Sequence, residues 1–101
     1  PDAYSWVHHP NRTWPKGAQI DLLLDRPDNT INLIEIKFSN EPFTITKSYA
    51  ENLRNKTGTF RGVTGTRKNL FLDFLTMHGV TQNVYAKELV DGEITTDQLF
   101  I

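Results

Sequence analysis

Three charged residues within two Ile- and Leu-rich segments are the best candidates for chemistry in this 101-residue chain: Asp21, Glu35 and Lys37. Carboxylate oxygens are the ligands that hard divalent cations such as Mg²⁺ prefer. A bound cation activates water for attack on a phosphodiester, and a neighbouring lysine stabilises the charge that develops in the transition state. These residue types therefore predict metal-dependent hydrolysis of a phosphodiester, with Asp21 and Glu35 as metal ligands.

A β-hairpin is expected to hold these side chains. The turn residues 26–30 (Arg-Pro-Asp-Asn-Thr) separate two apolar segments, 17–25 and 31–38, which is typical of a hairpin. With the turn centred on Asp28, Asp21 lies opposite Glu35. Because side chains alternate between the faces of a strand, one face is apolar and the other polar. The apolar face is expected to carry Ala18, Ile20, Leu22, Leu24, Ile34, Ile36 and Phe38, and the polar face Gln19, Asp21, Glu35 and Lys37.

Two carboxylates in opposed positions are unusual in a hairpin. Opposed side chains on one face have Cβ atoms about 4.5–5.5 Å apart, and like charges at that separation are destabilising. A divalent cation between Asp21 and Glu35 reverses the sign of that interaction. The alternative is an ordinary amphipathic hairpin whose charged face is solvated.

At these residues the chain resembles the PD-(D/E)xK nuclease superfamily, whose core hairpin carries an Asp and then a Glu-x-Lys on the next strand. Asp21 matches the Asp, and residues 35–37 (Glu-Ile-Lys) match the Glu-x-Lys. The strings GAQIDLLLDR, INLIEIKFS, FTITKSYAENLRNK and TRKNLFL are similar to the C-terminal domain of a group of bacterial AAA-type ATPases, over residues 14–100. The resemblance implies an α/β fold with a mixed central β-sheet flanked by helices and a restriction-endonuclease-like core.

The resemblance also implies a site and partners. Mg²⁺ or Mn²⁺ is expected on Asp21, Glu35 and the Ile36 carbonyl, with Lys37 positioning or polarising the attacking water. The resemblance implies that residues 1–101 form a single nuclease-like domain behind an N-terminal ATPase module of the same chain. The sequence starts with Pro rather than Met, so it is expected to be a fragment of a longer protein. The superfamily often uses a further acidic residue on a helix before the hairpin, which this sequence does not show. Two alternatives remain open: a catalytically silent module that binds nucleic acid or a partner and regulates the ATPase, and a structural domain for assembly.

The remaining segments are expected to complete one mixed sheet. Residues 4–7 form a first strand, Thr46 caps a helix, and the apolar run 69–76 forms a buried strand after a crossover. A last strand is expected at residues 86–90. A short helix capped by Thr95 or Thr96 follows, with Leu99 and Phe100 docked on the domain.

A local cluster of basic residues predicts contact with nucleic acid, although the formal net charge of the chain is only −1. Between residues 47 and 68 there is one acidic residue, Glu51, among six basic residues. Such a basic stripe can contact phosphates even in a nearly neutral protein. The alternative is a solvated helix face followed by a polar loop. The stripe consists of Lys47, Arg54, Lys56, Arg61, Arg67 and Lys68.

The composition excludes several other chemistries. The chain has no Cys, which excludes disulfides and thiolate metal sites and fits the expected cytoplasmic location. No apolar run approaches the ~20 residues that span a bilayer, so no membrane partner is expected. No phosphate-binding loop of the GxxxxGK[ST] type occurs in the sequence, so ATP hydrolysis is expected in the ATPase module alone.

Overall fold

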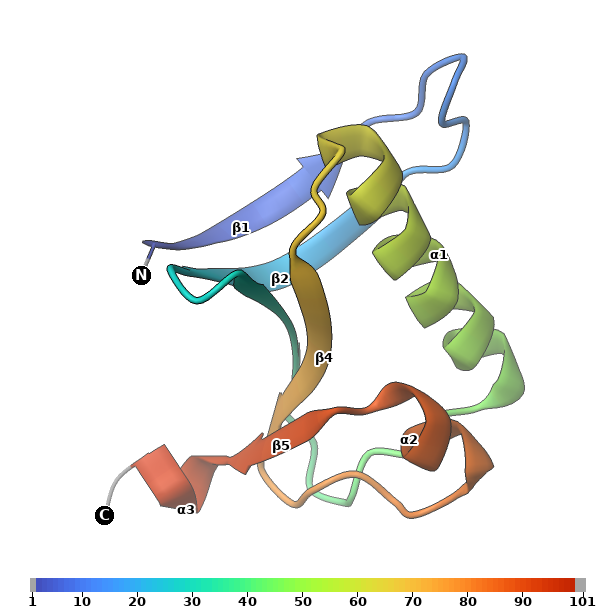
Figure 1. Cartoon of the computed structure of the whole chain (residues 1–101). Helices are drawn as coiled ribbons and strands as arrows, with labels where there is room; N and C mark the ends of the chain where they lie inside the picture. The colour runs from blue at the N-terminus through green and yellow to red at the C-terminus, as the bar shows by residue number, and fades with distance from the viewer. Residues whose placement is uncertain (1, 100–101) are drawn as a thin grey trace.

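The computed structural model describes residues 2–99, in which all five strands belong to one mixed sheet of order β1-β2-β3-β4-β5 (Figure 1). Strands β1, β2 and β3 pair antiparallel, whereas β4 and β5 join parallel to their neighbours. The expected mixed α/β sheet is therefore confirmed. The elements are β1 (Asp2–His8), β2 (Ala18–Arg26), β3 (Thr30–Lys37), α1 (Lys47–Thr64), β4 (Asn69–Thr76), α2 (Val84–Leu89), β5 (Gly92–Thr95) and α3 (Thr96–Leu99).

The helix α1 begins and ends where its capping residues predict. The hydroxyl oxygen of Thr46 accepts a hydrogen bond from the Tyr49 amide at 3.2 Å, which confirms Thr46 as the N-cap. Gly65 ends the helix with φ of 68°, a left-handed conformation that glycine adopts without steric cost. The two glycines within the helix do not interrupt it. Gly62 is needed because a Cβ there would lie 2.1 Å from the Trp14 ring of the β1–β2 loop.

The hydrophobic core lies between α1 and one face of the sheet. Leu53 and Phe60 of α1 are 1% and 2% exposed, and they belong to the same buried cluster as Leu33 of β3 and Phe74 of β4. Ala86 of α2 is part of this cluster, so both helices pack on that face. In Figure 1 no helix of the described chain covers the opposite face of the sheet.

The hairpin register is confirmed, but the expected division into faces is wrong in part. Leu22 pairs with Ile34, as a turn centred on Asp28 requires. Leu23 and Ile20, expected on opposite faces, are both buried in the core. Leu23 pairs with Leu33 and lies on the face of Glu35, which was expected to be polar and solvated but packs on the core. Ile20 reaches the same face through a bulge, because β1 pairs Tyr4 with Leu23 but Trp6 with Ile20, so that β2 contains one extra residue. A bulge shifts the alternation by one position.

The expected last strand at residues 86–90 is also wrong. Residues 84–89 form α2, whose N-cap Asn83 accepts a hydrogen bond from the Ala86 amide at 2.9 Å. The strand comes later, as β5, and pairs with β4. The expected docking of the Leu99 side chain and Phe100 lies outside what the structure describes.

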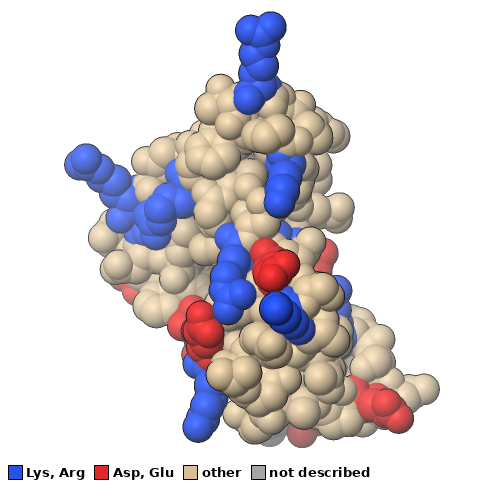
Figure 2. Space-filling model, turned by 90° about the vertical axis from the view of Figure 1, so that its right-hand side faces the viewer, with Lys and Arg blue, Asp and Glu red and all other residues tan. Residues whose placement is uncertain are grey.

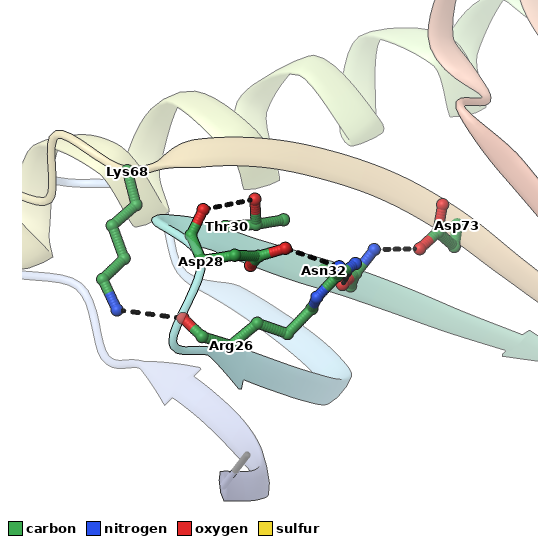
Figure 3. A network of polar contacts seen from close by, with 6 residues as sticks. All are labelled: Arg26, Asp28, Thr30, Asn32, Lys68 and Asp73. Atoms are coloured by element: carbon green, nitrogen blue, oxygen red, sulfur yellow. Dashed lines mark hydrogen bonds and ion pairs between the residues drawn. The ribbon is translucent and has the colours of Figure 1, made fainter.

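A polar network ties the hairpin turn to β4 on the uncovered face (Figure 3). Arg26 contacts Asp28 at 2.6 Å, and Asn32 donates to Asp73 of β4 at 2.7 Å. Burial raises the pKa of Asp73, the Asn32 hydrogen bond opposes this, and the charge of Asp91 adds to the rise. The network fixes β3 against β4 without touching the face that carries the core.

Candidate active site

Glu35 is a charged side chain inside the core. It lies on β3 beneath α1 and is 1% exposed. Its Oε1 atom accepts hydrogen bonds from the Lys56 ammonium at 2.5 Å and from the Tyr49 hydroxyl at 3.2 Å. Buried carboxylates are rarely tolerated without such partners. The helix therefore supplies the groups that keep Glu35 in place.

The second oxygen of the same carboxylate has no partner. Glu35 Oε2 is the one buried side-chain polar atom without a hydrogen bond among the described residues. A buried acceptor left unpaired costs about 1–3 kcal/mol. Such an unpaired atom calls for an explanation, and a binding site for a cation is one possible explanation.

Asp21 is held beside Glu35 by the backbone of β3. The Asp21 carboxylate accepts a hydrogen bond from the Ile36 amide at 2.9 Å. The pairing of β2 with β3 is regular from Arg26 to Leu22, and the bulge follows directly. The Asp21 side chain thus replaces a backbone acceptor at the end of the ladder.

The charges of Glu35 and Asp21 both influence the hydroxyl group of Tyr49. The pKa of Tyr49 is raised by burial first, then by the charge of Glu35 and the hydrogen bond to it, and then by the charge of Asp21. At neutral pH the Tyr49 hydroxyl therefore keeps its proton and donates a hydrogen bond to Glu35. Glu35 contacts the Tyr49 hydroxyl directly, and Asp21 is bonded to the backbone amide of the residue that follows Glu35.

Lys37 completes the group from the same hairpin. Its Nζ atom lies over the ring of Tyr49, 5.0 Å from the centroid, and over the ring of Phe43, 5.5 Å from the centroid. Cation–π contacts of this kind hold an ammonium without neutralising it. The structure therefore brings Asp21, Glu35 and Lys37 together around Tyr49.

Two site residues, Tyr49 and Lys56, were not recognised as such in the sequence. They are seven residues apart on α1, which is close to two turns, so both point to the sheet. Lys56 was assigned only to the basic stripe. The available signal was its spacing from Tyr49 and from the core residues Leu53 and Phe60, because a lysine on the buried side of a helix requires a buried partner.

A polar hollow at the surface includes Lys56 in its lining. It has a volume of about 420 Å³ and lies between β1, β2 and α1. The Lys56 side chain is 17% exposed, lines the hollow and pairs with Glu35, which is not part of the lining. The hollow is lined by Val7, His8, Gly17, Ala18, Gln19, Asn52, Asn55 and Lys56.

The residues partly fit a divalent cation. Among residues 2–99, no group of three or more His, Cys, Asp or Glu side chains is placed to hold a metal ion. Mg²⁺ does not require one, because it is commonly bound by one or two carboxylates with several waters. The unpaired Glu35 Oε2 suits such an ion, whereas Lys56 already neutralises Oε1.

The predicted basic stripe is only partly available to a phosphate backbone. Arg54 pairs with Glu88 at 3.1 Å, and Lys68 pairs with Asp25 at 2.7 Å and also approaches the Arg26 carbonyl, as Figure 3 shows. Arg61 donates to two carbonyls after the end of α1.

Two members of the stripe differ from the rest: Lys47 and Arg67 make neither an ion pair nor a side-chain hydrogen bond with the described residues, whereas Arg61 bonds to carbonyls. Figure 2 shows the α1 side of the molecule. Lys and Arg side chains are scattered among uncharged residues over its upper part, and Asp and Glu appear with them from the middle downward. The free positive charge is therefore concentrated at a few positions and does not form a continuous stripe.

Comparison with protein-family models, with curated proteins and with solved structures found no match. No helix in the described part of the chain is long and apolar enough to cross a membrane.

Proposed function

We propose that the chain is a PD-(D/E)xK-like domain that hydrolyses phosphodiester bonds of nucleic acid with Mg²⁺ or Mn²⁺. The observation that carries the proposal is the buried Glu35 carboxylate, whose Oε2 has no partner and whose neighbourhood contains Asp21 and Lys37. A core selected for stability alone would not retain this arrangement, because an apolar residue would avoid the unpaired oxygen.

Each side chain has a defined role in this proposal. Asp21 and Glu35 hold the cation, with the Ile36 carbonyl as a further ligand. The cation supplies an activated water and positive charge next to the scissile phosphate. Lys37 keeps its charge over the Tyr49 ring and stabilises the negative charge that develops on the phosphate oxygens. Tyr49 orients Glu35 through its hydroxyl.

The topology supports the restriction-endonuclease-like core that the proposal requires. The hairpin of β2 and β3 carries the Asp and the Glu-x-Lys, and α1 leads to the parallel strand β4. Nucleic acid is the proposed substrate because free basic residues flank α1. An ATPase module in the same chain is proposed on the sequence resemblance.

A second candidate is a catalytically silent module that binds nucleic acid or a protein and regulates that ATPase. The specific observation in its favour is the Lys56–Glu35 ion pair, which already neutralises one carboxylate of the proposed metal site. The absence of a third acidic ligand among residues 2–99 points the same way.

Metal titration with a parallel cleavage assay tests the proposal. Calorimetry with Mn²⁺ is expected to show one site, and Asp21→Asn is expected to weaken it by more than about tenfold because a charged ligand is lost. Glu88→Gln is the matched control, since Glu88 is an exposed carboxylate paired with Arg54. Cleavage of DNA or RNA is expected to be lost in Asp21→Asn only. Binding of Mn²⁺ without cleavage would select the silent module, and no binding at millimolar Mn²⁺ would remove the metal site.

A further inference from the structure

The Lys56–Glu35 ion pair involves only one of the two carboxylate oxygens. The ammonium contacts Oε1 at 2.5 Å and leaves Oε2 unpaired, although both side chains are largely buried. A lysine ammonium is a compact point charge and does not bind both oxygens of a carboxylate as an arginine does. The pair is therefore incomplete on the carboxylate side.

An incomplete buried ion pair is open to exchange. The attraction between two buried charges barely offsets their desolvation unless all remaining polar atoms are satisfied. A divalent cation carries twice the charge of Lys56, and it can bind oxygens of Glu35 and of Asp21 together. A divalent cation that displaces Lys56 would therefore provide a partner for Glu35 Oε2, which the ion pair leaves unpaired.

The polar hollow can accommodate the displaced Lys56 side chain. Lys56 is itself one of the residues that line the polar hollow of about 420 Å³. Its lining includes the amide side chains of Gln19, Asn52 and Asn55. Amide oxygens accept hydrogen bonds from an ammonium, and a lysine moves about four flexible bonds without a change of backbone.

We propose that Lys56 is an exchangeable counter-ion of Glu35, which a divalent cation displaces into the polar hollow. This inference rests on the proposed metal site and adds a regulation to it, since metal binding must replace an internal ion pair. Without metal, Lys56 neutralises the Glu35 carboxylate. This ion pair lowers the affinity of the site for the metal, because it must be broken when the metal binds. Lys56 is thus a competitor of the metal and not a ligand of it.

Mn²⁺ titration of the 101-residue protein tests the proposal without a cleavage assay. At pH 8.5, where protons compete little for carboxylates, Lys56→Met is expected to bind Mn²⁺ roughly ten- to a hundredfold more tightly than the unmodified chain, because one charge-assisted hydrogen bond no longer opposes the metal. Lys87→Met is the matched control. It removes the same charge from an exposed position on α2 and is expected to leave the affinity within about twofold.

Lys56→Arg keeps the test decisive if Lys56→Met does not fold. An arginine can occupy both oxygens of Glu35, so it is expected to bind Mn²⁺ more weakly than the unmodified chain. Equal or weaker binding in Lys56→Met, or tighter binding in Lys56→Arg, overturns the inference and leaves the proposed hydrolysis in place. Tighter binding in Lys56→Met without any cleavage supports the inference and rejects the hydrolysis. Absence of Mn²⁺ binding in all variants rejects both.

Discussion

Glu35 is buried in the core, yet only one of its two carboxylate oxygens has hydrogen-bond partners. One of its oxygens has two donors from α1 and the other has none. The two donors differ in kind: Lys56 carries a charge, and Tyr49 carries a proton that the surrounding charges prevent it from losing. The Tyr49 hydroxyl is thus a fixed hydrogen-bond donor at every pH at which the protein is expected to work.

Tyr49 gives the site a pH-dependent contribution to stability. The pKa of Tyr49 is raised in the folded state above its ordinary value near 10. Its contribution is therefore full below pH 10 and is lost as the pH rises above that value, because the unfolded chain releases the proton first. We expect the free energy of unfolding to fall more steeply between pH 9.5 and pH 11.5 in the unmodified chain than in Tyr49→Phe. Urea denaturation measures both, and parallel curves would contradict the assignment.

Among the secondary-structure elements, α1 connects most parts of the molecule. Its buried side supplies core residues and both partners of Glu35. Near its C-terminal end the Trp14 ring of the β1–β2 loop lies directly over Gly62. The Trp14 carbonyl also interacts with the His8 ring at 3.0 Å, at the edge of the polar hollow. Trp14 therefore contacts both α1 and His8, a residue that lines the hollow.

Alanine substitutions at two glycines of α1 distinguish the effect of helix propensity on stability from the effect of packing. Gly58 has nothing within 4 Å of an added Cβ, so Gly58→Ala is expected to stabilise the protein by about 0.5–1 kcal/mol. Gly62→Ala makes the same propensity gain four residues later, but its Cβ would lie 2.1 Å from the Trp14 ring. We expect a net loss of about 1–3 kcal/mol, because the ring and its loop must move. Thermal or urea unfolding gives both values, and equal stabilisation by the two substitutions would mean that Trp14 does not pack there.

Local sequence patterns predicted the parts of the fold that local chemistry determines. The turn around Asp28 set the hairpin register, and Thr46 set the start of α1. The bulge of β2 has no such signal at Asp21, since it becomes visible only through the pairing with β1. The segment 84–89 is a short apolar run that fits a strand or a helix, and only its Asn83 cap distinguishes them. The pairing of Lys56 with Glu35 spans 21 residues along the chain and depends on how α1 packs on the sheet.

At the scale of the whole molecule, one face of the sheet is closed by helices and the other is open. The proposed site lies on the closed face, where burial makes its charges interact strongly. The Asn32–Asp73 network lies on the open face and stabilises strand pairing. The formal net charge of −1 gives no general attraction to nucleic acid, so any such binding depends on where the basic residues are free.

The salt dependence of nucleic-acid binding reports which basic residues contact phosphates. Lys47 and Arg67 make no ion pair with the described residues, whereas Lys68 pairs with Asp25 at 2.7 Å. Each neutralised phosphate releases about one counterion, so log affinity falls linearly with log salt concentration. Lys47→Ala and Arg67→Ala are each expected to reduce that slope by about one.

Lys68→Ala serves as the comparison within the same set of basic residues. Its partner Asp25 already satisfies its charge, so the substitution is expected to change the slope less and to lower stability by about 0.2–1 kcal/mol. Fluorescence anisotropy of a labelled oligonucleotide between 50 and 200 mM salt measures the slopes, with Ca²⁺ in place of Mg²⁺ to prevent cleavage. A slope that none of the three substitutions changes would mean that nucleic acid does not bind along α1. Binding that is insensitive to salt would point instead to a protein partner for this surface.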